Sequence, residues 1–186
     1  TFNPLTPPYT TTAVETPSEG NLKITNSGSG VTGGLFSTLS PPSGKWYFEA
    51  YINAIGGNAG VGVTTDQNRI ERGTPSYSAY EGGVLYLSGG NKNVAGSSSS
   101  YGATYTTGDI IGVAFSIDDD EVTFYKNGSS QGATTLAAND GYWGSVATDP
   151  SNGAITINFG QDSSFAGTKT AQGNQDGNSI GDFYYT

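Results

Sequence analysis

Acid–base chemistry near neutral pH can use only carboxylates in this chain, because the sequence contains no His and no Cys. Ser-His-Asp and Cys-His nucleophilic sites are therefore excluded, as is a zinc site built from Cys or His. Glycoside hydrolysis needs two carboxylates about 5–10 Å apart across a sugar cleft. The candidates are Glu49, Glu71, Glu81 and Glu121 with the ten aspartates.

Glu49 is the only carboxylate on its strand-like segment, and the paired-acid strand motif of sandwich-fold glycanases is missing. We interpret Glu49 as a solvated side chain on a strand face. The sequence therefore predicts a protein that is not an enzyme and needs no cofactor. A glycan-active sandwich enzyme acting through Glu49 or Glu121 remains the alternative.

Asp118-Asp119-Asp120 could suggest calcium, which takes oxygen ligands from clustered carboxylates. The spacing lacks the alternating ligands of a calcium loop, and the tripeptide falls where a hairpin turn is required. We favour a turn and expect no metal site. The glycine pairs are turn signals too, since none lies between a strand and a helix with a following Lys-Ser/Thr.

The net charge of −9, with only five Lys and two Arg, leaves no cationic cluster to neutralise phosphates. Nucleic acid and anionic membrane surfaces are therefore not expected as partners. No stretch reaches the ~20 apolar residues that cross a bilayer, and no signal peptide is visible. Because the chain begins at Thr1, we expect a processed product or a piece of a longer protein.

Short segments in which the side chains alternate between two faces must position any functional side chain. They occupy residues 45–52, 60–65, 108–117, 121–128 and 154–160. In the first segment Trp46, Phe48, Ala50 and Ile52 share one face, which predicts that they point into a core. We expect Trp46 and Trp143 to be core residues and residues 89–102, rich in Asn and Ser, to form a loop.

The clearest hairpin joins residues 108–117 to residues 121–128, with Asp118–Asp120 at the turn. Asn127-Gly128 then supplies the positive-φ residues of a second tight turn. No segment of ten or more residues shows a 3.6-residue apolar period. The sequence therefore predicts an all-β fold, a two-sheet antiparallel β-sandwich.

These segments, in this order, resemble a SPRY domain. Lys45-Trp46-Tyr47-Phe48-Glu49 is similar to the family's opening strand, and residues 109–128 look like its most diagnostic hairpin. The resemblance implies two bent antiparallel sheets, as in a concanavalin-like or lectin-like jelly roll, and a binding role. We predict a Pro/Thr-rich arm or edge strand at 1–20, the sandwich at 21–165, and a polar Gly/Asn-rich tail at 166–186 that ends in an aromatic segment.

The two ends of the chain, at Asn3–Leu5, Ser18–Leu22 and residues 173–185, also resemble SPRY-containing structural proteins of tailed bacteriophages, some of them marine. On this resemblance we expect a binding or structural module of a virion protein at the virion surface or outside the cell. Its expected partners are a host-surface glycan or protein, or neighbouring virion subunits. A homo-oligomer within the parent assembly is compatible with this expectation. The alternatives are a purely structural assembly module and a peptide-binding SPRY domain of a cellular protein.

Family ligands meet one rim of loops, which by position implies candidate binding residues in four segments. Polar side chains in loops are not needed for core packing, which makes them candidates for ligand contacts. A plain solvated loop remains the alternative. The tyrosines could stack on a ligand or fill the core. The candidates are Asp66, Asn68, Arg69, Tyr77, Tyr80, Asn91, Asp149 and Asn152.

Overall fold

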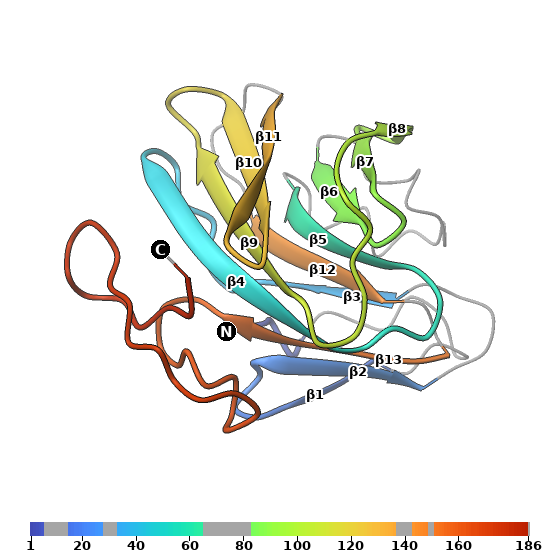
Figure 1. Cartoon of the computed structure of the whole chain (residues 1–186), viewed down its shortest axis with the longest axis vertical. Helices are drawn as coiled ribbons and strands as arrows, with labels where there is room; N and C mark the ends of the chain where they lie inside the picture. The colour runs from blue at the N-terminus through green and yellow to red at the C-terminus, as the bar shows by residue number, and fades with distance from the viewer. Residues whose placement is uncertain (6–14, 28–32, 65–82, 137–142, 149–150, 186) are drawn as a thin grey trace.

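The computed structural model describes residues 1–5, 15–27, 33–64, 83–136, 143–148 and 151–185. These residues form two antiparallel sheets packed face to face, as Figure 1 shows. The two-sheet, all-β prediction is confirmed. Within these ranges no helix is present that could cross a membrane.

The first sheet has seven strands in the order β1-β2-β13-β4-β9-β10-β11. Its strands are β1 (Glu15–Ser18), β2 (Lys23–Ser27), β13 (Ser151–Asn158), β4 (Lys45–Ala54), β9 (Ile110–Ser116), β10 (Glu121–Lys126) and β11 (Ser129–Thr135). β1 is one edge of this sheet and β11 is the other.

The second sheet has six strands in the order β3-β12-β5-β6-β7-β8. Its strands are β3 (Gly33–Phe36), β12 (Trp143–Thr148), β5 (Ala59–Thr64), β6 (Val84–Leu87), β7 (Asn91–Val94) and β8 (Ser97–Ser100). All six residues of β5 are buried, because this strand lies inside the sheet.

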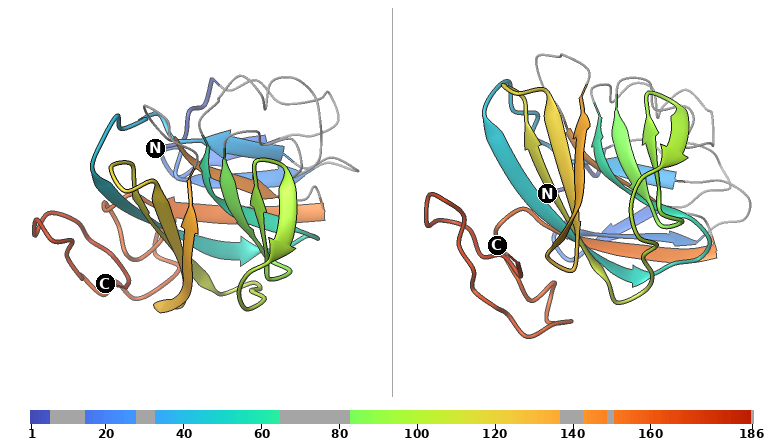
Figure 2. Two further views of the ribbon diagram at one scale, coloured as in Figure 1. Left: turned by 90° about the horizontal axis from the view of Figure 1, so that it is seen from above. Right: turned by 45° about the horizontal axis from the view of Figure 1, so that its top comes forward.

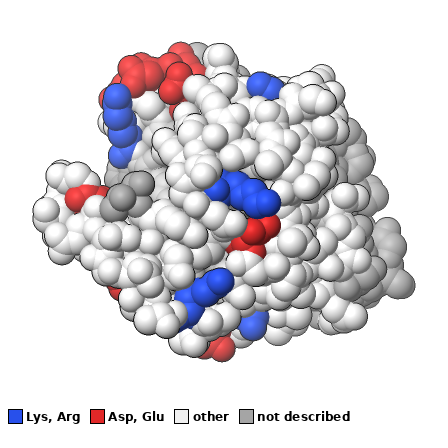
Figure 3. Space-filling model, viewed as in Figure 1, with Lys and Arg blue, Asp and Glu red and all other residues white. Residues whose placement is uncertain are grey.

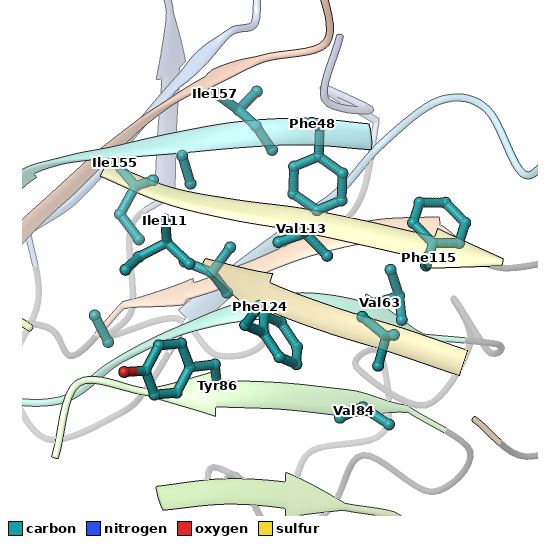
Figure 4. Packing of buried hydrophobic residues seen from close by; sticks show 14 of the residues in the cluster. Phe48, Val63, Val84, Tyr86, Ile111, Val113, Phe115, Phe124, Ile155 and Ile157 are labelled. Carbon is teal, nitrogen blue, oxygen red and sulfur yellow. The ribbon is translucent and has the colours of Figure 1, made fainter. Parts of the chain in front are cut away.

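The core lies between the two sheets and is rich in aromatic and β-branched side chains, which fit a pleated, buried surface. Figure 4 shows Phe48, Val113 and Phe124 from the first sheet facing Val63 and Tyr86 from the second. These five residues are at most 2% exposed. The alternation read along β4, β9 and β10 therefore identified the inward faces of these strands.

The predicted hairpins are confirmed. β9 and β10 pair from Ser116 and Glu121 onward, so Asp118–Asp120 lie in the connecting turn. Asn127 (φ 49°) and Gly128 (φ 78°) connect β10 to β11 with the positive dihedrals of a two-residue turn.

The expectation of a loop over residues 89–102 is wrong, because this segment forms the hairpin β7–β8. Ala95 (φ 48°) and Gly96 (φ 86°) make its two-residue turn. The strands carry few apolar side chains and β8 is fully exposed, so they give no alternation to read. Backbone pairing to β6, not burial, positions them.

The solvated interpretation of Glu49 and the core interpretation of Trp46 are also wrong. Glu49 is 0% exposed, although it alternates with the core residues Phe48 and Ala50, because the chain after β13 covers the outer face of β4. Figures 1 and 2 show this C-terminal segment, in red, beside the first sheet and away from the second. Trp46 lies at the start of β4, beyond the edge of the core, and is 48% exposed. The Trp143 side chain lies outside the described part of the structure.

Candidate functional site

Most of the predicted binding residues lie outside the described residues. Two of them are described, Asn91 and Asn152, and both are exposed. Asn91 is the first residue of β7, and Asn152 has a φ of 63° at the start of β13. The others, for which the prediction stays a prediction, are Asp66, Asn68, Arg69, Tyr77, Tyr80 and Asp149.

The strand register places the flanks of the predicted loops at two opposite ends of the second sheet. Thr64, after which residues 65–82 begin, pairs with Trp143. At the other end of these strands, Ala59 pairs with Thr148, just before the β12–β13 connection that leads to Asn152. Six strand residues span roughly 20 Å. Asn152 therefore lies a strand length away from the point where the 65–82 segment begins.

Asn91 lies at the same end as Asn152. β6 runs antiparallel to both β5 and β7, with Leu87 opposite Gly60 and Tyr86 opposite Lys92. The connection from β6 to β7 therefore follows the Ala59 end of β5, and Asn91 begins there. The structure brings Asn91 and Asn152 to one end of the sandwich, and the flank of residues 65–82 to the other.

An apolar pocket of about 360 Å³ opens at the Thr64 end of the sandwich. Aromatic rings from β4, β9 and the end of β13 line it, with Phe48 5.5 Å from Phe159 and 6.5 Å from Phe115 between ring centroids. Two large apolar side chains at the pocket reach solvent, Leu39 (74% exposed) and Trp46 (48% exposed). The full lining is Thr1, Ser37, Thr38, Leu39, Ser40, Pro41, Pro42, Trp46, Tyr47, Phe48, Phe115, Gly144 and Phe159.

The segment after β3 is fixed against β12 and forms one wall of the pocket. The Ser37 N–H donates to the Gly144 carbonyl (2.8 Å), and the Gly144 N–H donates to the Ser37 hydroxyl (3.0 Å). That hydroxyl in turn donates to the Leu39 carbonyl (2.7 Å). The backbone that presents Leu39 is thus held in place before any ligand arrives.

The turn before β4 is held by the β9–β10 turn. The Gly44 N–H donates to Asp118 Oδ1 (3.0 Å), and Lys45 Nζ lies 2.9 Å from Asp119 Oδ2. The Trp46 indole N–H donates to the Ser43 carbonyl (2.8 Å), which fixes the ring orientation. Gly44 has a φ of 90°, a value that favours glycine.

The charge beside the pocket is negative. The β9–β10 turn carries Asp118, Asp119 and Asp120, followed by Glu121, and Figure 3 shows a group of acidic side chains at this end of the molecule. A hydrogen bond from Lys45 lowers the pKa of Asp119, so this carboxylate stays ionised. In the described part of the chain no group of three or more acidic residues is arranged to hold a metal ion. The pocket can therefore accept an apolar side chain with a cationic group beside it.

Sequence reasoning missed this pocket because the alternation in β4 places Trp46 with the core residues. A signal was present in Pro41-Pro42-Ser43-Gly44, which ends the preceding segment only two residues before the Trp. A large aromatic residue so close to a strand end lies where the sheets no longer cover each other. Such a residue is a candidate for a surface site.

A two-sheet fold with such a pocket is typical of β-sandwich binding modules. Comparison of the sequence with known families identifies the family. A family model described as "SPRY domain" matches residues 45–162. The chain belongs to the SPRY domain family, as the resemblance read from residues 45–128 had implied. SPRY domains are generally non-enzymatic binding modules.

Solved structures show the same fold. The chain superposes on the SPRY domain of human HERC1 with a TM-score of 0.65 and 22% identity, covering 87% of this chain and 99% of that one. The stonustoxin structure matches with a TM-score of 0.63 and 19% identity, over 84% of this chain and 26% of that one. These similarities support the two-sheet architecture.

Among curated proteins, Ran-binding protein 9 of Xenopus tropicalis is 30% identical over 152 residues. The match covers 77% of this chain and 28% of the relative. The Ran-binding proteins 9/10 homolog of Drosophila melanogaster (28% identity, 78% and 16%) and human Ran-binding protein 9 (27% identity, 77% and 21%) are also similar. The chain spans about a quarter or less of these relatives' length.

These relatives overturn the bacteriophage interpretation. They are animal proteins whose names describe them as Ran-binding, and the similarity extends over three quarters of the chain. The expected role in a virion protein, the expected host-surface or virion partners, and the expected place at the virion surface are therefore wrong. The resemblance of the chain ends to phage proteins rested on three short stretches, Asn3–Leu5, Ser18–Leu22 and residues 173–185, all of which lie outside the matched residues 45–162. The alternative of a SPRY domain in a cellular protein is the better supported.

Proposed function

We propose that this chain is a non-enzymatic, protein-binding SPRY module of a cellular protein. Its pocket beside Trp46 takes an apolar side chain from an extended segment of a partner protein. A basic residue next to that side chain lies against the acidic β9–β10 turn. The observation that carries the proposal is the half-exposed Trp46 at the mouth of an apolar pocket.

The exposure of Leu39 and Trp46 supports a macromolecular ligand. Burying a large apolar side chain that is otherwise in water stabilises a complex by about 1.5–3 kcal/mol. Tryptophan is enriched among the residues that dominate protein interfaces. Leu39 and Trp46 flank the same pocket, so one inserted side chain would cover both.

The chemistry of the lining favours a protein segment over a small polar metabolite. Small-molecule sites combine apolar walls with a few converging polar groups, and their volumes run from about 300 to 1,000 Å³. This pocket is at the lower end of that range, and the Ser37 hydroxyl already binds Gly144 and Leu39. The walls of the pocket provide an apolar surface of defined shape, and charged groups lie only at its edge.

The proposal is tested by selecting peptides from a random display library on the immobilised full chain and measuring the affinity of the selected peptides by calorimetry. We expect an apolar residue next to Lys or Arg to be enriched, and Trp46→Ala to weaken binding at least tenfold. Ile180→Ser is the matched control, since Ile180 is 82% exposed but lies in the C-terminal segment. Selected peptides that bind Trp46→Ala and the parent equally would contradict the proposal.

A further inference from the structure

The floor of the pocket beside Trp46 consists of aromatic rings and the Gly144 backbone. Phe48 lies 5.5 Å from Phe159 between ring centroids, and Phe115 meets Phe48 edge to face at 6.5 Å. A Cβ at Gly144 would lie 3.2 Å from a ring carbon of Phe48 and 3.2 Å from one of Phe159, so glycine lets these rings approach the backbone of β12. A ligand group that reaches the floor therefore meets aromatic carbon.

The polar groups of the lining already have hydrogen-bond partners within the chain. The Ser37 hydroxyl accepts the Gly144 N–H and donates to the Leu39 carbonyl, while the Gly144 carbonyl accepts the Ser37 N–H. The Trp46 indole N–H donates to the Ser43 carbonyl. A ligand hydroxyl or N–H brought to the floor would have to share or displace one of these bonds.

The Tyr47 side chain also lines the pocket, but its hydroxyl is bound on the outer face of the first sheet. It donates to Glu49 Oε1 (3.2 Å), which also accepts the Tyr185 N–H (2.8 Å). Glu49 Oε2 accepts the Tyr184 N–H (2.8 Å) and the Asn158 side-chain amide (3.2 Å). The phenol of Tyr47 is therefore held in a separate network and is turned away from a ligand in the pocket.

We propose that the pocket selects the side chain of phenylalanine, so that the partner is a protein segment in which Phe stands next to Lys or Arg. This inference rests on the proposed function and names the side chain that the pocket accepts. An apolar cavity of about 150 Å³ is enough to hold benzene. The pocket, at about 360 Å³, therefore has room for a phenyl ring. Such a ring can meet Phe48 and Phe115 edge to face, the arrangement that aromatic pairs favour.

Tyrosine and tryptophan are disfavoured because each carries a polar group that needs a partner when it is buried. A buried hydroxyl without a partner weakens binding by about 10- to 100-fold. Leucine avoids this loss but has no ring to pack against the aromatic floor. The paired state of Ser37 and Gly144 thus acts as the determinant of specificity.

The charge at the mouth decides between a protein segment and a lipid chain as the apolar ligand. Lys45 pairs with Asp119, which leaves Asp118, Asp120 and Glu121 to keep the β9–β10 turn negative. Asp118 is exposed and is bound to the Gly44 N–H, two residues before Trp46. This charge attracts a basic residue beside the Phe and repels the carboxylate of a fatty acid.

The experiment compares anchor residues within one peptide selected on the full chain. The peptide is synthesised with Phe, Tyr, Leu or 4-methylphenylalanine at the anchor position, and each affinity is measured by calorimetry. The methyl group has nearly the size of the hydroxyl group, so this pair separates hydrogen bonding from fit. We expect the Tyr peptide to bind at least about tenfold more weakly than the 4-methylphenylalanine peptide. Dodecanoate should not compete with the Phe peptide, and competition would overturn the choice of a protein segment.

The possible failures can be told apart. A selection that yields no peptide dependent on Trp46 would overturn the proposed function, and this inference with it. Peptides that depend on Trp46 but bind equally well with Tyr and with 4-methylphenylalanine would overturn the inference alone.

Ser37→Ala tests the determinant itself, because it leaves the Gly144 N–H without its acceptor. A tyrosine anchor can then accept that N–H, so the preference for 4-methylphenylalanine over Tyr should fall by about threefold or more. Ser40→Ala removes another hydroxyl of the lining and is the matched control, with an unchanged preference. The same preference in all three proteins would contradict the assignment to Ser37 and Gly144. If Ser37→Ala does not fold, the peptide series on the parent chain decides the proposal.

Discussion

Replacing Glu49 by Gln tests how the C-terminal segment is held. The substitution preserves shape but exchanges one acceptor oxygen for an NH₂ group, which then faces at least one group that can only donate. With the NH₂ group in place of Oε1, the bond from the Tyr185 N–H is lost, whereas the Tyr47 hydroxyl can turn to accept from the amide. With the NH₂ group in place of Oε2, the bonds from the Tyr184 N–H and the Asn158 side-chain amide are both lost. Either orientation loses one of the 2.8 Å backbone bonds.

The expected loss follows from the number of bonds. Hydrogen bonds to charged groups contribute about 1.5–3 kcal/mol each. The orientation with the NH₂ group toward Tyr47 loses one of them and leaves the others with a neutral partner, so the loss is about 3 kcal/mol. Part of this returns, because a neutral amide avoids the burial penalty that raises the pKa of Glu49. We expect a net weakening of about 2 kcal/mol, which corresponds to a factor of about 30.

Native-state hydrogen exchange at the Tyr184 and Tyr185 amides is the direct assay. Segments with few core contacts open locally before the domain unfolds, so exchange at these two amides should accelerate about 30-fold while that of Ile111 in the core changes little. Glu121→Gln is the matched control, because Glu121 is an exposed carboxylate on β10 of the same sheet. Unchanged exchange at Tyr184 and Tyr185 in Glu49→Gln would refute the reasoning.

Three further outcomes follow from the geometry. Gly112→Ala should lower the free energy of unfolding by about 1–3 kcal/mol, measured in urea, because its Cβ displaces Tyr47, whereas Gly89→Ala has open space and serves as control. Burial raises the pKa of Glu49 above its value in the unfolded chain. The folded chain therefore holds this proton more tightly than the unfolded chain does. The stability that protonation of Glu49 contributes is full below pH ~4.5 and is lost as the pH rises through the folded pKa, and this slope should vanish in Glu49→Gln. Asp118→Asn keeps the acceptor for the Gly44 N–H but removes a negative charge. Calorimetry should therefore show that basic peptides bind more weakly and that their affinity depends less on salt. Equal affinity of the variant and the parent at low salt would show that the acidic β9–β10 turn does not contribute to binding.

The sequence predicted the fold where side-chain alternation and turn chemistry agreed. In β9 and β10, apolar residues alternate on both sides of an Asp-rich turn, and Asn127-Gly128 demands positive φ, so local and global signals coincide. In β7 and β8 the strands are made of Asn, Lys and Ser, and only pairing along the sheet edge makes them strands. Alternation cannot reveal a strand that buries almost nothing.

The functional residues were less predictable, because their surroundings come from distant parts of the chain. Glu49 alternates correctly with Phe48 and Ala50, yet it is buried by residues some 135 positions later. Trp46 follows the same alternation, yet it lies past the end of the core beside Leu39. Side-chain alternation with a period of two assigns each residue to a face of the sheet, but it does not show which other part of the chain covers that face.

The most direct test of the central claim uses the indole resonances of the two Trp residues. The Trp46 indole N–H, which donates to Ser43 at 2.8 Å, can be assigned with Trp46→Phe and followed in a ¹⁵N–¹H spectrum while a selected peptide is added. The account predicts that this resonance shifts saturably, with the same dissociation constant that calorimetry gives. A peptide that binds by calorimetry while the Trp46 resonance stays in place would show that the pocket is not the binding site.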